Sequence, residues 1–228
     1  MTSPRDRVWL LAVAAEKRLT NLPVLGPLLS GPCDRFFAKR FVTDLQALHD
    51  VLEGSEMAQR YWVWAGLLLG WVREGGPIPH DRDADLGLLD DDLERLLATV
   101  PALRRAGFRP LMQYRNNAGH LSELTFRKHG AKFEFFVFSR HGDACRSYTF
   151  GYPPDHLVEV EFEVPAQDYV EFELVGRRWL CHTDYERELE LMYGDWRTPR
   201  RQWNYLTDDR SIVTSRKWNN IDTSWSDT

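Results

Sequence analysis

The sequence predicts an α+β fold in which a mixed β-sheet is flanked by helices, with helical additions towards the N- and C-terminal ends. Three strand-like stretches follow one another between residues 109 and 138 without a helical stretch between them. Helical periodicity occurs in other segments, above all residues 36–59 and 183–193. Because helices and strands are intermixed and several strands are adjacent, the sheet is expected to be mixed.

The chain of 228 residues is 43% apolar and 28% charged, which is typical of a globular protein. It contains no internal repeat, low-complexity tract or long linker, and this favours one compact unit. We expect a helical N-terminal segment over residues 1–59, a catalytic domain over 60–200 and a tail over 201–228. The net charge of −5 gives no global support for nucleic-acid binding, so no nucleic-acid partner is expected.

The N-terminal segment contains the apolar run Val8–Ala15, which the charged residues 16–18 end. No stretch approaches the roughly 20 apolar residues of a transmembrane helix, so no membrane-spanning segment is expected. We predict that residues 5–19 form a helix that packs on the domain, and a shallow contact with a membrane surface is the alternative.

The three cysteines lie far apart and form no CxxC pair; they are Cys33, Cys145 and Cys181. This pattern predicts neither a structural zinc site nor a disulfide framework. Scattered free cysteines suit a reducing compartment, so we expect a cytoplasmic protein, with peripheral membrane association left open.

The first elements of the chain are predicted to be a helix, a strand, a helix start and a loop. The apolar residues of segment 36–59 recur at the spacing of one helix face, at Phe41, Leu45, Leu48 and Leu52. This segment is therefore predicted to be an amphipathic helix. Aromatic and β-branched residues predict a short strand over Tyr61–Ala65, and Gly66 and Gly70 bracket a turn or helix start. The glycines and prolines of residues 74–81 indicate a loop.

The elements that follow are predicted to be mainly strands. The apolar residues of segment 84–88 alternate with an aspartate and a glycine, as in a strand. Asp90–Asp92 can cap the next helix, over residues 91–106, which Gly107 ends. Further strands are expected over residues 109–114, 121–127, 132–138, 157–164 and 169–175. A helix is expected over 183–193, and the polar, tryptophan-rich C-terminal residues have no clear period.

Asp81, Asp83 and Asp85 are spaced by two. Residues i and i+2 of a strand project to the same face, so Asp83 and Asp85 should lie side by side. Ionised carboxylates in such proximity repel one another, and a hard cation such as Mg²⁺ relieves that cost. A solvated acidic face is the ordinary interpretation of an isolated DxD pattern. Here a glycine-bracketed turn upstream and a second carboxylate strand downstream favour a metal site.

The second carboxylate strand is Lys132–Phe138, in which Glu134 is a charge among apolar residues. A charge in a buried strand needs a partner or a metal. Lys132 shares the parity of Glu134, so it is expected to pair with Glu134 or to contact a phosphate. Two carboxylates on one strand and a third on a neighbour suit phosphoryl transfer, in which the third takes a proton from an attacking hydroxyl. We therefore predict Asp83, Asp85 and Glu134 to be catalytic, with Mg²⁺ or Mn²⁺ as cofactor.

The segment Gly66–Gly87 is GLLLGWVREGGPIPHDRDADLG and closely resembles the signature of the LicD/fukutin family. In that signature a G-[TS]-x-L-G-x-x-R segment precedes an I-P-[HW]-D-x-D-x-D-[LI]-G segment. The segment Tyr193–Pro199 is similar to a second motif of the family. The resemblance spans residues 60–200 and implies the mixed-sheet core of the nucleotidyltransferase superfamily.

The resemblance also implies an activity: transfer of a phospho-alcohol, such as phosphocholine or ribitol phosphate, from a CDP-activated donor. The acceptor would be a hydroxyl of a glycan or glycolipid, and CMP would leave. By this resemblance Asp83 and Asp85 are metal ligands, Asp81 is a further ligand, and Glu134 is the third carboxylate of the superfamily.

The donor-binding turn of the family corresponds to Gly66, Gly70 and Arg73, where backbone N–H groups and a guanidinium can hold phosphate oxygens. His80 lies beside Asp81 and is expected to orient it or to contact the donor, and a solvated loop histidine is the alternative. The chain departs from the signature at Leu67, where the family has Thr or Ser, so a hydroxyl that could contact phosphate is missing. Glu134 stands where Asp is common.

Two other functions stay open at this point. The same fold could transfer a nucleotidyl group from an NTP and release pyrophosphate instead of CMP, or it could be a non-catalytic binding module. The full set of carboxylates argues against the binding module. Near the C-terminus, Tyr193 and Trp196 are expected to pack on the core. The arginines of segment 197–201 are expected to form a solvated face, with an anionic acceptor or a lipid phosphate as the alternative ligand.

Overall fold

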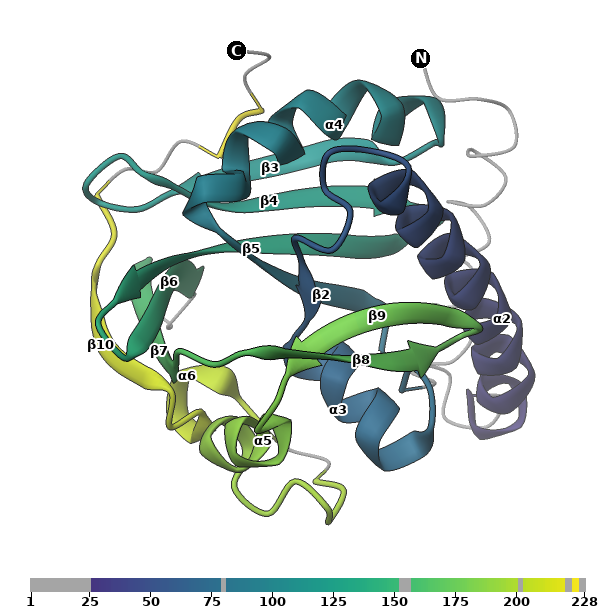
Figure 1. Cartoon of the computed structure of the whole chain (residues 1–228). Helices are drawn as coiled ribbons and strands as arrows, with labels where there is room; N and C mark the ends of the chain where they lie inside the picture. The colour runs from purple at the N-terminus through teal and green to yellow at the C-terminus, as the bar shows by residue number, and fades with distance from the viewer. Residues whose placement is uncertain (1–25, 79–80, 152–156, 201–202, 220–222, 226–228) are drawn as a thin grey trace.

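The computed structural model describes residues 26–78, 81–151, 157–200, 203–219 and 223–225, with side chains from residue 37 onward in these ranges (Figure 1). The predicted helix over residues 5–19 lies outside the described residues. Helix α2, Gly26–Glu53, begins and ends earlier than the predicted range of 36–59. The four apolar residues that predicted this helix are all buried in the main core, as expected. Within the described residues, no helix is both long enough and apolar enough to span a membrane.

An eight-stranded sheet forms the centre of the molecule (Figure 1). Its strands run in the order β1-β2-β5-β6-β7-β10, while β4 pairs with β5 and β3 with β4. Their bounds are Trp62–Val63 (β1), Asp83–Leu89 (β2), Arg109–Arg115 (β3), Leu121–Lys128 (β4), Ala131–His141 (β5), Ala144–Gly151 (β6), Val158–Pro165 (β7) and Ile212–Lys217 (β10). Strands β2 and β5 are parallel, and the other pairs of described strands are antiparallel. The predicted α+β class with a mixed sheet is confirmed.

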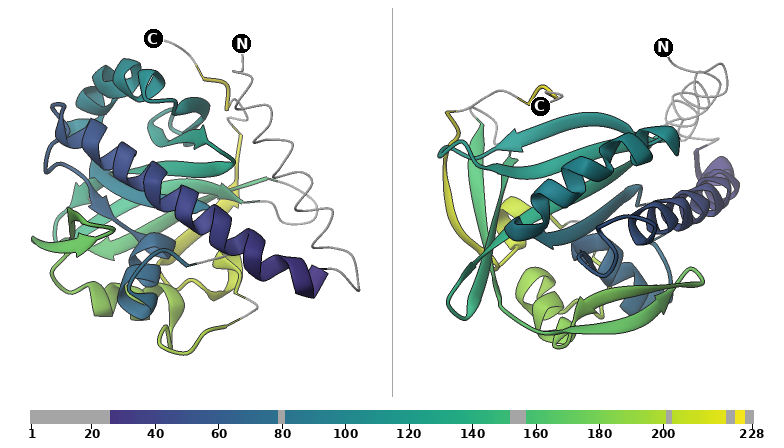
Figure 2. Two further views of the ribbon diagram at one scale, coloured as in Figure 1. Left: turned by 90° about the vertical axis from the view of Figure 1, so that its right-hand side faces the viewer. Right: turned by 45° about the horizontal axis from the view of Figure 1, so that its top comes forward.

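The remaining elements surround this sheet. They are α3 (Ala65–Glu74), a 3₁₀ turn over Asp90–Asp92 that leads into α4 (Leu93–Arg105), the hairpin of β8 (Tyr169–Leu174) and β9 (Arg177–His182), α5 (Tyr185–Tyr193) and α6 (Tyr205–Asp208). Helix α4 lies along β3, while α5 and α6 lie at the opposite end of the molecule (Figure 1). Helix α2 crosses the molecule diagonally in front of the sheet (Figure 2, left).

The two faces of β2 and β5 differ in chemistry. The face that packs into the main core is apolar and consists of Ala84, Leu86, Leu88, Phe133, Phe135 and Val137. Residues of α2, α3, α4 and the β8–β9 hairpin complete this core. Because side chains alternate along a strand, the acidic residues of both strands must project to the opposite face. This alternation gathers the predicted site residues on one side of the sheet.

The sheet curls around that second face. Trp64, directly before α3, packs against Phe136 of β5 and Phe162 of β7, with ring centroids 4.8 and 5.5 Å apart. Strand β6 separates β5 from β7 in the sheet, and β6, β7 and β10 run in a different direction from β3, β4 and β5 (Figure 1). The curl leaves a hollow between the acidic face of β2 and β5 and the strands that follow.

A glycine fixes the approach of β1 to β2. Trp62 of β1 is register partner to Gly87 of β2, and a Cβ atom at Gly87 would overlap the indole of Trp62. The side chain of Trp62 is 2% exposed and stacks near Phe138 and His182. Gly87 therefore allows the indole to lie directly on the sheet.

Three strands were not predicted: β6, β9 and β10. The buried face of β6 includes Ser147 and Thr149, so the strand lacks an apolar alternation. Strand β10 is an edge strand with only Ile212 partly covered, and its pattern carries no period. The C-terminal addition is therefore mainly a strand, since α6 has 4 residues. Trp218 anchors it by donating from Nε1 to the Arg115 carbonyl at 3.1 Å.

Candidate active site

Strands β2 and β5 bring the two central carboxylates together. Asp85 is register partner to Glu134, and Asp83 to Lys132, on parallel neighbours. The predicted pairing of a DxD strand with a second carboxylate strand is thus present in the sheet. Strand β4 pairs with the other edge of β5 and places Thr125 opposite Glu134.

The N-terminus of α3 lies against Asp85. The Gly66 N–H donates to Asp85 Oδ2 at 3.1 Å, and the Trp64 N–H donates to the Asp85 carbonyl at 3.0 Å. Between them, Ala65 has a φ of +45°, a left-handed conformation that non-glycine residues rarely adopt. Backbone strain of this kind concentrates at functional sites. The first turn of α3 therefore presents its N–H groups and its positive dipole end to the acidic cluster.

Gly66 leaves room for two carboxylates. A Cβ atom at this position would lie 2.9 Å from Asp81 Oδ2 and 3.3 Å from Asp85 Oδ2. The oxygens of Asp81 and Asp85 thus approach one point above the start of α3. Asp81 Oδ1 also accepts the N–H of Asp83 at 3.3 Å, which ties the loop residue to the strand.

Lys132 is the cation within the cluster. Its Nζ lies 3.4 Å from Glu134 Oε1 and 3.8 Å from Asp83 Oδ2. Burial lowers the pKa of Lys132, but the charges of Glu134 and Asp83 outweigh it and raise the pKa overall. The ion pair between Glu134 and Lys132, one of the two alternatives from sequence, is therefore present.

Glu123 is a site residue that sequence reasoning missed. It is 2% exposed on β4, and it accepts hydrogen bonds from Thr125 Oγ1 at 3.0 Å and Thr149 Oγ1 at 2.6 Å. Burial raises its pKa. Glu123 is a charged residue within the predicted strand 121–127, just as Glu134 is within 132–138. The same pattern could therefore have indicated Glu123 as a site residue.

The negative charges of the clustered carboxylates are not fully balanced by the positive charges and hydrogen-bond donors around them. Burial, and then the charges of Glu134, Asp81 and Asp83, raise the pKa of Asp85 well above its usual value, against the Gly66 N–H. Burial, and then the charge of Glu123, raise the pKa of Glu134 to about 8, against the pairing with Lys132. Such a cluster favours either proton uptake or a bound cation.

The donor set fits a hard divalent cation. Carboxylate oxygens are the ligands that Mg²⁺ and Mn²⁺ prefer, and Asp81 and Asp85 already approach one point. In the part of the chain that the structure describes, no three acidic, histidine or cysteine side chains are yet arranged closely enough to hold a metal ion. The side chain of Asp83 is 44% exposed, and its Oδ2 lies 3.8 Å from Lys132 Nζ.

Two large cavities meet at the cluster. The first, of about 560 Å³, is lined by five acidic residues besides Asp81: Asp83, Asp85, Glu123, Glu134 and Asp209. We call it the carboxylate cavity. The second, of about 520 Å³, is lined by Arg73, Arg200, Trp196 and neighbouring residues, and we call it the arginine cavity. The residues common to both are Gly66, Asp81, Tyr193 and Trp203.

The other predicted binding residues occupy different places. Arg73 lines the arginine cavity, with its Nε 2.8 Å from Glu74 Oε1 and its Nη1 donating to the Trp196 carbonyl at 3.4 Å. Gly70 lines neither cavity. A Cβ atom there would lie 2.8 Å from the Gly76 carbonyl oxygen, so Gly70 lets the following loop close on α3. His80 lies outside the described residues.

Position 67 faces the core. Leu67 is 2% exposed and belongs to the main core cluster, and it lines neither cavity. The side chain at this position thus stabilises α3 on the sheet rather than contacting a ligand.

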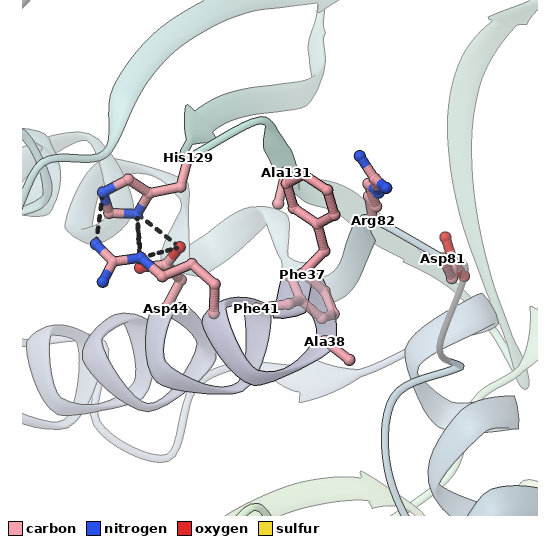
Figure 3. Close-up of a pocket in the computed structure, with 9 residues that line it drawn as sticks. Phe37, Ala38, Phe41, Asp44, Asp81, Arg82, His129 and Ala131 are labelled. Carbon is pink, nitrogen blue, oxygen red and sulfur yellow. Dashed lines mark hydrogen bonds and ion pairs between the residues drawn. The ribbon is translucent and has the colours of Figure 1, made fainter. Parts of the chain in front are cut away.

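Helix α2 supports the start of β2 (Figure 3). The Arg82 guanidinium lies 4.0 Å from the ring centroid of Phe37, and the Arg82 carbonyl accepts the Lys132 N–H at 2.9 Å. Farther along the helix, Asp44 lies 2.8 Å from His129 Nδ1 and 3.4 Å from Lys128 Nζ. The contacts of Asp44 connect α2 to the β4–β5 turn. The contacts of Arg82 fix the residue that lies between Asp81 and Asp83.

Comparison with known proteins adds a family match. The sequence model of the family described as "LicD/FKTN/FKRP, nucleotidyltransferase domain" matches residues 58–173, just over half of the chain. An uncharacterized protein of Rickettsia typhi is 34% identical over 61 residues, which are 27% of this chain and 19% of the relative. An uncharacterized protein of Rickettsia prowazekii is 35% identical over 60 residues, which are 26% and 22% respectively. The chain thus spans about a fifth of the length of these curated relatives.

Proposed function

This chain belongs to the family of LicD/FKTN/FKRP nucleotidyltransferase domains, and on that premise we propose that it is a metal-dependent phosphotransferase. It moves a phospho-alcohol, such as phosphocholine or an alditol phosphate, from a CDP-activated donor to a hydroxyl of a glycan or glycolipid, and it releases CMP. The observation that carries the proposal is the gathering of Asp83, Asp85 and Glu134 on one face of two parallel strands, beside the N-terminus of α3.

The residues that would hold Mg²⁺ or Mn²⁺ are Asp81, Asp83, Asp85 and Glu134. When bound, the cation supplies positive charge that offsets the phosphate oxygens of the donor and of the departing CMP. The raised pKa values of Asp85 and Glu134 support this assignment, because their shared excess of negative charge is what a cation relieves.

The residues of the chain divide the remaining work. The N–H groups at the start of α3 orient donor phosphate oxygens, and Arg73 and Lys132 contribute positive charge beside them. Glu134 accepts the proton of the acceptor hydroxyl while its oxygen forms a bond to phosphorus and the bond to CMP breaks.

The test is a CMP-release assay with Mg²⁺, a panel of CDP-conjugates (choline, ribitol, glycerol) and a glycan acceptor. We expect metal-dependent CMP release from one donor, lost in Asp85→Asn. The matched control is Asp91→Asn, which removes the same charge from an exposed residue that lines neither cavity. Release of pyrophosphate from an NTP, with no CMP from any conjugate, would assign the site to nucleotidyl transfer instead.

A further inference from the structure

Two cavities of similar size share one boundary, and Asp81 of the acidic cluster lies on it. Both the carboxylate cavity and the arginine cavity are large enough for a small ligand, at about 560 and 520 Å³. Gly66 and Asp81 form part of the boundary, and Gly66 donates to Asp85. A group transferred at this cluster can therefore be approached from two sides.

The cavities differ in charge. Six acidic residues line the carboxylate cavity, whose one described cation is Lys132. The arginine cavity carries two guanidinium groups, Arg73 and Arg200, against Asp81 at the boundary and Asp195. Arg200 is exposed and forms no ion pair with another described residue. A phosphate-bearing ligand is therefore better matched by the arginine cavity.

The arginine cavity also has an aromatic wall. Trp203 packs on Tyr193 with ring centroids 4.7 Å apart, and Trp196 lines the same space. The indole Nε1 atoms of Trp196 and Trp203 have no hydrogen-bond partner among the described residues. Aromatic faces stack on nucleobases, and unpaired N–H donors suit a ligand rich in acceptor atoms.

The geometry of phosphoryl transfer places the acceptor and the donor nucleotide in different cavities. Glu134, the proposed base, lines the carboxylate cavity and not the arginine cavity, so the acceptor hydroxyl must reach phosphorus from the carboxylate side. In phosphoryl transfer the attacking and leaving oxygens lie roughly in line on opposite sides of phosphorus. The leaving nucleotide then points into the arginine cavity.

We infer that the arginine cavity binds the nucleotide of the donor, with Arg73 and Arg200 on its phosphates and Trp203 beside its base, while the acceptor enters through the carboxylate cavity. This inference rests on the proposed phosphotransferase function. In the step it describes, the acceptor oxygen bonds to phosphorus and passes its proton to Glu134. CMP leaves with the electron pair of the broken P–O bond.

The experiment places one tryptophan in each cavity and measures CMP binding by calorimetry in the presence of Mg²⁺. Thr198 lines only the arginine cavity and Leu111 only the carboxylate cavity, and both are exposed. We expect Thr198→Trp to weaken CMP binding roughly tenfold or more, since the indole fills the cavity. Leu111→Trp is expected to keep CMP affinity within about twofold and to lower turnover.

A charge variant checks the same inference. Arg200→Ala is expected to weaken CMP binding roughly tenfold. The control Arg178→Ala removes the same charge from a side chain that is 78% exposed and lines neither cavity, and it should leave CMP affinity unchanged. Thermal unfolding of each variant confirms that it is folded.

The outcomes separate this inference from the function beneath it. If the wild type binds CMP and only Leu111→Trp weakens binding, the nucleotide occupies the carboxylate cavity and the inference is wrong, while the phosphotransferase proposal stands. CMP binding that neither tryptophan nor Arg200→Ala alters would also overturn it. A wild type that binds no CMP and releases none from any CDP-conjugate would remove the proposed function, and the inference with it.

Discussion

Asp85 of β2 and Glu134 of β5 are register partners on neighbouring parallel strands, and both side chains face away from the main core. Their proximity is set by the backbone ladder and not by a flexible loop. Burial and then the charge of Glu134 raise the pKa of Asp85, while burial and the charges of Glu123 and Asp83 raise the pKa of Glu134.

Asp85→Asn should abolish turnover without unfolding the protein. The amide oxygen can still accept the Gly66 N–H, while the loss of a buried charge removes repulsion from Glu134, Asp81 and Asp83. We expect a loss of roughly 100-fold or more in turnover, with a melting temperature equal to or above that of the wild type. Circular dichroism melting and the CMP-release assay measure the two effects. Undiminished turnover would contradict the metal-site assignment.

Glu134→Gln should remove activity and keep donor binding. The amide cannot take the proton of the acceptor hydroxyl, so turnover should fall by roughly 100-fold or more. CMP affinity measured by calorimetry should change little, because the phosphates are held by other groups. If CMP binding is lost together with turnover, Glu134 acts through the cation that it helps to hold and not as the base.

Gly66→Ala should impair function more than stability. The new methyl group would compete for space with the carboxylate ends of Asp81 and Asp85, which can rotate away at little cost to the fold. We expect a weaker apparent Mg²⁺ affinity in the CMP-release assay and a nearly unchanged melting temperature. An unchanged Mg²⁺ dependence would show that these two carboxylates need not converge above Gly66.

Gly87→Ala should instead destabilise the fold. Its Cβ atom would overlap the buried indole of Trp62, which cannot move without disturbing the buried cluster that it forms with Trp64 and Phe138. Overpacking of this kind costs about 1–3 kcal/mol or more, which urea denaturation would measure. Gly76→Ala is the matched control, because a Cβ atom there meets nothing within 4 Å. Equal stability of the two variants would show that β1 can shift from β2 without cost.

Asp209 should make stability depend on pH. Burial raises its pKa to about 6 from the ordinary 3.8, against the hydrogen bonds from Ser211. A carboxyl group whose folded pKa is raised stabilises the fold in its protonated form. This contribution is complete below about pH 4 and is lost as the pH rises through about 6.

Asp209→Asn keeps an oxygen that can accept both hydrogen bonds, from the Ser211 N–H and Oγ. It should flatten the stability profile between about pH 4 and pH 6, by an amount on the order of 2–3 kcal/mol. Urea denaturation at several pH values measures this difference. A variant with the same pH profile as the wild type would assign the dependence to another group.

The local chemistry of the candidate site could be predicted from the residue pattern. Asp83 and Asp85 share a strand face because the side-chain period of a strand is two, and Glu134 was conspicuous as a charge among phenylalanines. The glycine of the turn, Gly66, could be predicted from its motif, although its reason, the space taken by Asp81 and Asp85, is visible only in three dimensions.

The surroundings of those residues depend on contacts between segments that are distant in the sequence. Glu123 and Thr149 join the site because β4 and β6 bring them to the curled face, and Trp203 reaches the boundary of both cavities from the C-terminal segment. Strand β10 completes the sheet although its own residues carry no apolar alternation. The physical reason is that a residue pattern fixes which face a side chain takes, whereas the neighbour across a strand is chosen by contacts between distant segments.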